Sequence, residues 1–279
     1  MRVGIIGAGK IGSAIISGLN GCFHEDIEII ASGRSDSTLR NIEKLGGRPT
    51  RSNTEVVSTS DLIFLSVKPY HFPTVVADVP PDVWGGKTVV SIMAGVRLRT
   101  LRELLPGAKV FRAMPNINAL VQMSATAVAP SEMAGSDEGL LVGKALACLG
   151  SVRWVSEELL DVWTGLVGSG PAFLAEVIDA LVLGAVATGM RRDVAYEAVL
   201  DVMLGTAKLL KSREGKHLLE LRDEVTTPAG TTIEGLKTLE REGVKAGLIG
   251  VVEAAVRRSK EIGEEIDTSV MRAAKNGGN

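Results

Sequence analysis

Three glycines near the N-terminus have the spacing of a phosphate-binding turn. Gly7, Gly9 and Gly12 follow a short apolar run at residues 3–6 and precede small and apolar residues at helical spacing. In such a turn the first glycine bends the chain, the second leaves room for a pyrophosphate, and the third lets the helix pack closely on the strand. The free N–H groups at the start of the helix then face the phosphates. The segment predicts a dinucleotide site, and an ordinary glycine-rich turn is the alternative.

The residues after the next apolar run, 27–31, bear on the choice of dinucleotide. An NAD site usually carries an acidic residue here for the ribose hydroxyls, whereas an NADP site prefers arginine for the 2′-phosphate. This chain reads Ser32-Gly33-Arg34-Ser35, with no acid. Because Arg34 would form charge-assisted bonds with a phosphate, we expect NADPH, with NADH as a weaker alternative. The other interpretation is that Arg34 is a solvated loop charge.

Polar residues also follow two later strands. The run 62–67 ends at Lys68-Pro69, and since proline cannot continue a central strand, Lys68 belongs at the rim near the cofactor or is a surface lysine. Asn116 follows the run 109–114 and is a candidate to face the nicotinamide. Asn53 would contact the adenosine ribose or cap a helix.

A hydroxyl-rich loop lies far from these segments, at residues 225–236. It reads Val-Thr-Thr-Pro-Ala-Gly-Thr-Thr and then enters a helical pattern. The N–H groups at that helix start, together with the threonine hydroxyls, suit a carboxylate. A helix start without any ligand is the alternative.

The elements that must position these residues divide the chain into two parts. Up to about residue 155, apolar runs alternate with helical patterns, which is typical of an α/β fold with a doubly wound, mostly parallel sheet that binds ligands at the carboxyl ends of its strands. We therefore predict a Rossmann-type domain at 1–155 and an all-α domain at 156–279. The expected strands are 3–6, 27–31, 62–67, 88–93, 109–114, 125–129 and 152–155. The expected helices include 36–45, 98–105, 137–149, 172–188 and 193–212.

The helix at 172–188 is apolar nearly all round, so it must be covered on every side. A helical domain of about 120 residues hides few such helices alone, and we expect a homodimer core. Glu176 and Asp179 interrupt the helix. A place on a solvated groove, or the capping of neighbouring backbone groups, is favoured over an acid–base role.

Composition limits the remaining function classes. A length of 279 residues fits about two domains, and a net charge of −2 gives no case for nucleic acid or an anionic membrane as partner. Two cysteines and three scattered histidines predict neither a disulfide framework nor a metal site. We find no signal-peptide pattern and no apolar run long enough to cross a bilayer, so a cytoplasmic location is the expectation.

These motifs, taken in order, resemble the pyrroline-5-carboxylate reductase family over essentially the whole chain. The resemblance is carried by Gly7-Ala8-Gly9-Lys10-Ile11-Gly12, Leu65-Ser66-Val67-Lys68-Pro69, Met114-Pro115-Asn116, Gly168-Ser169-Gly170-Pro171-Ala172-Phe173 and, above all, residues 225–236. It implies an NADPH-binding Rossmann domain, a helical dimerisation domain, and dimers that often assemble into pentamers of dimers. It also implies hydride transfer to the C=N carbon of 1-pyrroline-5-carboxylate, giving L-proline in the last step of proline biosynthesis.

The resemblance also implies the site. The substrate-binding residues would be Thr227, Gly230, Thr231 and Thr232, and Thr232, which matches the family's threonine near the imine nitrogen, would be the catalytic residue. The cofactor-binding residues would be Gly7, Ala8, Gly9, Lys10, Ile11, Gly12, Ser32, Arg34, Asn53, Val67, Lys68, Ala94 and Asn116.

Two departures and several rival functions accompany this resemblance. Ala229 stands where the family usually has glycine and is strained if its φ is positive. Asn116-Ile117-Asn118 replaces the usual Asn-Thr-Pro. One rival is another Rossmann oxidoreductase, such as an F420-dependent NADP reductase, which lacks the loop at 225–236, or a β-hydroxyacid dehydrogenase, which needs a lysine that helix 172–188 lacks. The other is a non-catalytic NADP-binding protein.

Overall fold

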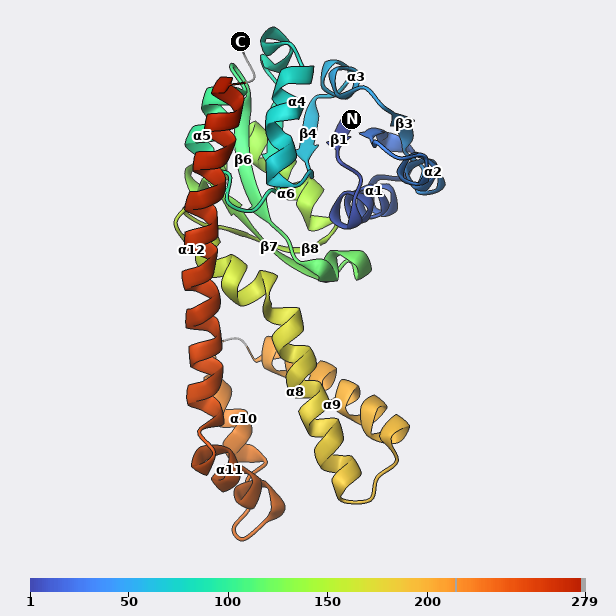
Figure 1. The fold of residues 1–279 in the computed structure, drawn as a ribbon. Helices are drawn as coiled ribbons and strands as arrows, with labels where there is room; N and C mark the ends of the chain where they lie inside the picture. The colour runs from blue at the N-terminus through green and yellow to red at the C-terminus, as the bar shows by residue number, and fades with distance from the viewer. Residues whose placement is uncertain (214, 277–279) are drawn as a thin grey trace. The chain divides into compact units, whose positions relative to one another are not determined.

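The computed structural model describes residues 1–213 and 215–276. The chain forms two compact units, which we describe separately (Figure 1). The first unit comprises Met1–Ser169 and Ala254–Asn279, and the second, called the helical unit below, comprises Gly170–Glu253. The predicted division at residue 155 differs from this one in two ways: the first unit continues to Ser169, and Ala254–Asn279 returns to it.

The first unit is built on one eight-stranded sheet with the order β3-β2-β1-β4-β5-β6-β7-β8. Every neighbouring pair is parallel except β6 and β7, where Arg112 lies opposite Ala129. The predicted doubly wound, mostly parallel fold is therefore confirmed. The strands are β1 (Arg2–Ile6), β2 (Glu28–Ser32), β3 (Arg48–Thr50), β4 (Leu62–Leu65), β5 (Thr88–Ser91), β6 (Lys109–Met114), β7 (Ser124–Ala129) and β8 (Gly150–Trp154).

Two strand predictions need correction. Strand β3 was not expected, because it has only three residues and Pro49 at its centre, which an edge strand tolerates. Strands β4 and β5 each end two residues earlier than predicted, at Leu65 and Ser91. The residues that follow them therefore form loops at the carboxyl edge of the sheet.

Helices cover both faces of this sheet and close two hydrophobic cores. Ile15 of α1 and Leu146 of α6 belong to the core on one face. Phe72 of α4, Leu101 of α5 and Val270 of α12 belong to the core on the other. The helices of the first unit are α1 (Lys10–Phe23), α2 (Asp36–Lys44), α3 (Asn53–Thr59), α4 (Phe72–Asp78), α5 (Leu98–Leu104), α6 (Asp137–Ala147), α7 (Leu159–Trp163) and the second part of α12 (Val244–Asn276).

The second part of α12 is an integral piece of the first unit. Figure 1 shows it, in red, beside α5. A Cβ built on Gly95 would lie 3.1 Å from the Cα of Gly263, so the loop after β5 and this helix are in close contact. A local pattern of apolar residues does not show such a return of the chain.

The helical unit begins with a pair of packed helices, α8 (Gly170–Ala187) and α9 (Arg192–Ser212). The N-cap residue of α9 is Arg191, and Asp193 in the first turn pairs with the guanidinium of Arg191 at 2.6 Å. The unit continues with α10 (Leu218–Glu224), α11 (Thr231–Arg241) and the first part of α12.

A π-helical turn, Thr164–Gly168, follows α7, and Ser169 is a bend between this turn and the start of α8 at Gly170. The helical segment Leu159–Ala187 is apolar and long enough to cross a membrane by length and composition, contrary to expectation, and only 6% of its most apolar window is buried within this chain. Core helices of soluble proteins meet the same criterion of length and composition.

Candidate functional site

The glycine turn has the geometry that a dinucleotide site needs. Gly7 has φ of +94°, which L side chains rarely adopt, and a Cβ on Gly12 would lie 2.4 Å from the carbonyl oxygen of Gly7. Gly9 is the N-cap of α1, no side chain caps this helix, and a Cβ on Gly9 would meet no atom within 4 Å. The turn therefore leaves open space in front of the first N–H groups of α1, which is where a pyrophosphate binds.

A cleft of about 830 Å³ opens at this turn, along the carboxyl ends of the parallel strands. Its size is that of a cofactor site. Of the thirteen predicted cofactor residues, eleven line it: Gly7, Ala8, Gly9, Lys10, Ile11, Ser32, Arg34, Asn53, Val67, Lys68 and Ala94. The residues present thus fit a dinucleotide, and the early ends of β4 and β5 bring Val67, Lys68 and Ala94 into the wall.

The two other predicted cofactor residues do not line the cleft. Gly12 lies against the carbonyl of Gly7, as its packing role requires. Asn116 is buried and its Nδ2 donates to the carbonyl of Val167 at 3.1 Å. Its Oδ1 has no hydrogen-bond partner among the residues that the structure describes.

Asn53 is held in the cleft by side-chain bonds on both sides. The hydroxyl of Ser32 donates to Asn53 Oδ1 at 2.7 Å, and Asn53 Nδ2 donates to Asp78 at 3.0 Å. The alternative reading as a helix cap is wrong, since Ser52 caps α3 by accepting from the N–H of Glu55. Asn53 is therefore fixed at the carboxyl edge beside the end of β2.

Several residues in the cleft wall were not predicted from the sequence, among them Arg51, Tyr70 and His71. Arg51 follows the unpredicted strand β3, and its guanidinium bonds to the carbonyl of Arg34 and pairs with Asp36. Tyr70 and His71 follow Lys68-Pro69 directly, so the strand end that pointed to Lys68 could also have pointed to them.

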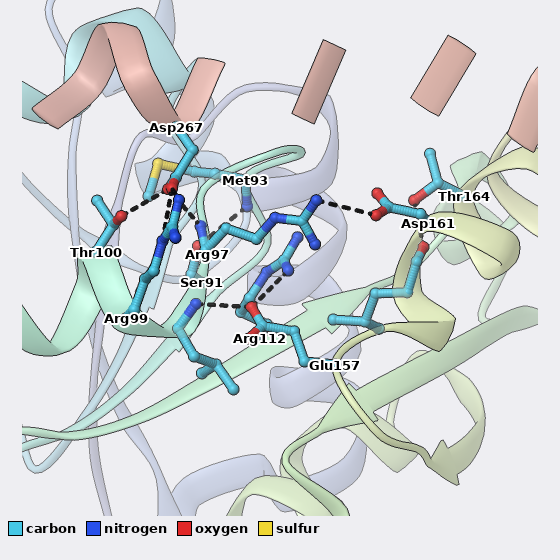
Figure 2. A network of polar contacts seen from close by, with 12 residues as sticks. Ser91, Met93, Arg97, Arg99, Thr100, Arg112, Glu157, Asp161, Thr164 and Asp267 are labelled. Carbon is cyan, nitrogen blue, oxygen red and sulfur yellow. Dashed lines mark hydrogen bonds and ion pairs between the residues drawn. The ribbon is translucent and has the colours of Figure 1, made fainter. Parts of the chain in front are cut away.

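A network of charged side chains fixes the loop between β5 and α5, whose Met93 and Ala94 line the cleft (Figure 2). Asp267 of α12 accepts from the backbone N–H of Arg97 at 2.9 Å and from the hydroxyl of Thr100 at 2.6 Å, and pairs with Arg99. Burial by itself would raise the pKa of Asp267, but these hydrogen bonds outweigh it and hold the pKa below its usual value.

Two further ion pairs extend this network. Arg97 pairs with Asp161 of α7 at 3.3 Å. Arg112 pairs with Glu157 at 2.7 Å, and the same carboxylate accepts from the N–H of Leu98. The loop that lines the cleft is thus fixed by side chains from α7, from the turn before it and from α12.

The four predicted substrate residues form one turn in the helical unit. Gly230 is the N-cap of α11, and no side chain caps this helix, so its first N–H groups remain available to a carboxylate. The N–H of Gly230 donates to the carbonyl of Thr227 at 3.1 Å. A Cβ on Gly230 would lie 2.3 Å from Thr227 Oγ1, so a larger residue there would displace the Thr227 side chain.

The strain anticipated at Ala229 is present. Its φ is +54°, one of three positive φ values among the non-glycine residues that the structure describes. Alanine in this left-handed region costs about 1–2 kcal/mol. The turn therefore keeps a conformation in which glycine would be easier.

Comparisons with known proteins match the two parts of the chain to two family models. Residues 157–262 match the family model for pyrroline-5-carboxylate reductase dimerisation, and residues 2–95 match the model for coenzyme F420-dependent NADP oxidoreductases. The latter match covers only the N-terminal nucleotide-binding part, as the shared glycine pattern led us to expect.

Full-length relatives extend the similarity over both units. Pyrroline-5-carboxylate reductase 3 of Mus musculus is 40% identical over 266 residues, which are 95% of this chain and 97% of the relative. A structure of a pyrroline-5-carboxylate reductase from Coxiella burnetii is 29% identical, with a TM-score of 0.85 over 93% of this chain and 97% of that one. The Plasmodium falciparum pyrroline carboxylate reductase with NADP bound is 25% identical, with a TM-score of 0.81 over 94% of this chain and 98% of that one.

Proposed function

The chain belongs to the pyrroline-5-carboxylate reductase family, and on that premise we propose that its cleft holds NADPH and that its turn at residues 227–232 holds the carboxylate of the substrate. The enzyme reduces 1-pyrroline-5-carboxylate to L-proline, the last step of proline biosynthesis. The observation that carries the assignment of the cleft is the open space beside Gly9 at the uncapped start of α1.

Bound NADPH supplies the hydride that adds to the C=N carbon. The first N–H groups of α1 bind its pyrophosphate, which Gly9 admits. Arg34, with Ser32, binds the adenosine end. Val67, Lys68 and Ala94 hold the nicotinamide end, because they lie on the loops after β4 and β5. These residues contribute position, and a fixed orientation of the two reactants is itself a large part of the rate enhancement.

The helical unit binds the other reactant, the cyclic imine substrate. The N–H groups of Thr231 and Thr232 hold the carboxylate, because the N–H of Gly230 already donates to the carbonyl of Thr227. The hydroxyl of Thr232 lies near the imine nitrogen. A proton delivered there through Thr232 and ordered water accompanies the hydride, so that C=N becomes CH–NH.

The role of Thr232 is tested by Thr232→Ala, with Thr238→Ala as the matched control on the same helix. The hydroxyl of Thr238 donates only to the carbonyl of Glu234, at 3.2 Å. Thr232→Ala should lower kcat more than the affinity for NADPH, and Thr238→Ala should change neither. An unchanged kcat in Thr232→Ala removes Thr232 from the mechanism.

The chain forms a dimer, in agreement with its match to the dimerisation model. Large apolar side chains lie exposed on α8 and α9, among them Leu174, Leu181, Leu183, Val194, Val202 and Leu204. The partner covers this surface, so the segment Leu159–Ala187 lies in protein and not in lipid. We place the enzyme in the cytoplasm as a pentamer of dimers, which light scattering tests by the mass of ten chains.

The function is tested by following NADPH oxidation after addition of 1-pyrroline-5-carboxylate to the purified protein, with NADH measured beside it. NADPH should be oxidised faster than NADH, with proline as the product. Absence of oxidation with either nucleotide would overturn the proposal.

A further inference from the structure

Three nitrogen-bearing side chains meet at one end of the cleft, and only one of them was expected. Arg34 follows β2, Arg51 follows β3, and His71 lies in the turn Pro69–His71 after β4. All three line the cleft, together with the hydroxyls of Ser35 and Thr38. The end of β2 is the place that distinguishes NADPH from NADH, because the 2′-phosphate binds there.

The side chains of Arg34 and His71 are in direct contact. Nη2 of Arg34 lies 2.8 Å from Nε2 of His71. A guanidinium stays protonated and only donates, so Nε2 accepts and the imidazole is neutral, with its proton on Nδ1. Within residues 1–213 and 215–276, Arg34 has no carboxylate partner, so its charge remains available to an anion.

The other charged and titratable groups around His71 are few. Arg51 is partly neutralised by Asp36, which leaves Arg34 as the uncompensated cation on that side. Lys68 and Tyr70 lie on the same segment as His71, and the Tyr70 ring is 4.3 Å from the imidazole, centroid to centroid. Asp78 of α4 also lines the cleft, and its carboxylate accepts a hydrogen bond from Asn53 Nδ2.

We propose that His71 is a protonation-dependent part of the 2′-phosphate subsite, so that binding of NADPH, but not of NADH, takes up a proton at His71 Nε2. When a 2′-phosphate enters, the N–H of Arg34 that His71 accepts is redirected to the phosphate. Nε2 is then free to bind a proton and donate it to the same anion. This inference rests on the proposed NADPH site.

The driving force is the charge of the phosphate. A phosphate monoester carries close to two negative charges at neutral pH, and an adjacent anion favours the charged form of histidine. Histidine titrates between pH 5 and 8, so a modest change in its surroundings alters its charge under physiological conditions. Arg51 supports the site by its contact with the backbone of Arg34.

The consequence is a preference for NADPH that weakens as the pH rises. One proton taken up on binding changes affinity by at most about tenfold per pH unit. We therefore expect the affinity for the 2′-phosphate to fall as the pH rises above neutrality, within this limit. Protonation of the phosphate itself, near pH 6, acts in the opposite direction at lower pH.

The test uses adenosine 2′,5′-bisphosphate and 5′-AMP, which differ by the 2′-phosphate and need neither nicotinamide nor turnover. Calorimetric titration in two buffers of different ionisation enthalpy gives the number of protons bound. The bisphosphate should take up a proton and 5′-AMP should not. His71→Gln should abolish this uptake, whereas His24→Asn, a histidine outside the cleft replaced by a residue that tolerates positive φ, should leave it unchanged.

Two results separate this inference from the proposed function. Binding of both nucleotides with equal proton uptake, or uptake that persists in His71→Gln, overturns the role of His71 and leaves the NADPH site intact. Absence of binding by both nucleotides and by NADPH overturns the site itself, and the inference with it.

Discussion

Asp267 and Arg97 are 170 positions apart in the chain, yet the carboxylate of Asp267 accepts a hydrogen bond from the backbone N–H of Arg97 at 2.9 Å. Arg97 is the N-cap residue of α5, whose own side chain makes no capping bond. A residue of the last helix therefore does the capping for a helix in the middle of the sheet domain. The same loop carries Met93 and Ala94 into the cofactor cleft.

Asp267→Asn should lower the free energy of unfolding by about 2–4 kcal/mol at pH 7, because a buried carboxylate with several charged and polar donors is lost. NADPH should also bind more weakly, since the loop after β5 loses its anchor. The matched control is Asp61→Asn, which breaks an exposed pair with Arg2 and should cost at most about 1 kcal/mol. Thermal melts and NADPH titrations of both variants check this, and equal effects would contradict it.

The effect of Asp267 should depend on pH in one direction. Its pKa in the folded protein lies below the ordinary value, so its stabilisation is fully present above the unfolded-chain pKa of about 3.9. It is lost as the pH falls through the folded pKa. The difference in melting temperature between the wild type and Asp267→Asn should therefore be constant from pH 7 to 5 and shrink below about pH 4. A difference that grows in acid would contradict this cause.

Gly9→Ala should weaken NADPH binding by about tenfold or more, roughly 1.4 kcal/mol, without lowering the melting temperature. The added Cβ meets no protein atom, so it occupies only space that the pyrophosphate needs. Gly21→Ala is the control, because it lies on the same helix and also has no atom within 4 Å. Fluorescence titration with NADPH should show a lower affinity for Gly9→Ala than for Gly21→Ala. Equal affinities would contradict the placement of the pyrophosphate beside Gly9.

Ala229→Gly should stabilise the protein by up to about 1 kcal/mol, because glycine adopts a φ of +54° without strain. The greater freedom of glycine in the unfolded chain offsets part of that gain. Ala147→Gly, at the end of helix α6, is the control and should destabilise the protein. The melting temperatures of both variants test this prediction. A lower melting temperature for Ala229→Gly would show that the turn does not need a positive φ at this position.

The two cysteines should react at very different rates. Burial, followed by the neighbouring thiol of Cys22, raises the pKa of Cys148 to about 12, whereas Cys22 is exposed. Since the thiolate is the reactive form, a thiol reagent at pH 8 should label one cysteine of the folded chain and the second only after unfolding. Cys22→Ser should remove the fast phase, and a fast phase that survives would contradict the assignment.

Much of the cleft could be predicted because its chemistry is local in the sequence. The glycine spacing, the arginine after β2 and the proline after Lys68 each act within a few residues of a strand end. The strain at Ala229 could likewise be predicted from the sequence, because alanine stands there where the family usually has glycine. These features need no knowledge of distant packing.

The remainder depends on contacts between distant segments. Strand β3 pairs through its backbone and has too few apolar residues to show a period. Arg51 and His71 approach Arg34 only because three strand ends meet at one edge. Nothing near Asp267 in the sequence indicates that it caps α5, and the antiparallel pairing of β7 depends equally on tertiary structure.

The division of α12 between the two units has a consequence for synthesis on the ribosome. Residues 1–169 are translated long before Ala254–Asn279, yet both belong to one compact unit. Until the segment with Asp267 and Val270 leaves the exit tunnel, the nascent sheet domain exposes the apolar surface that Val270 covers and lacks the carboxylate of Asp267. A premature stop codon that removes only the last helix should therefore yield a nascent chain prone to aggregation.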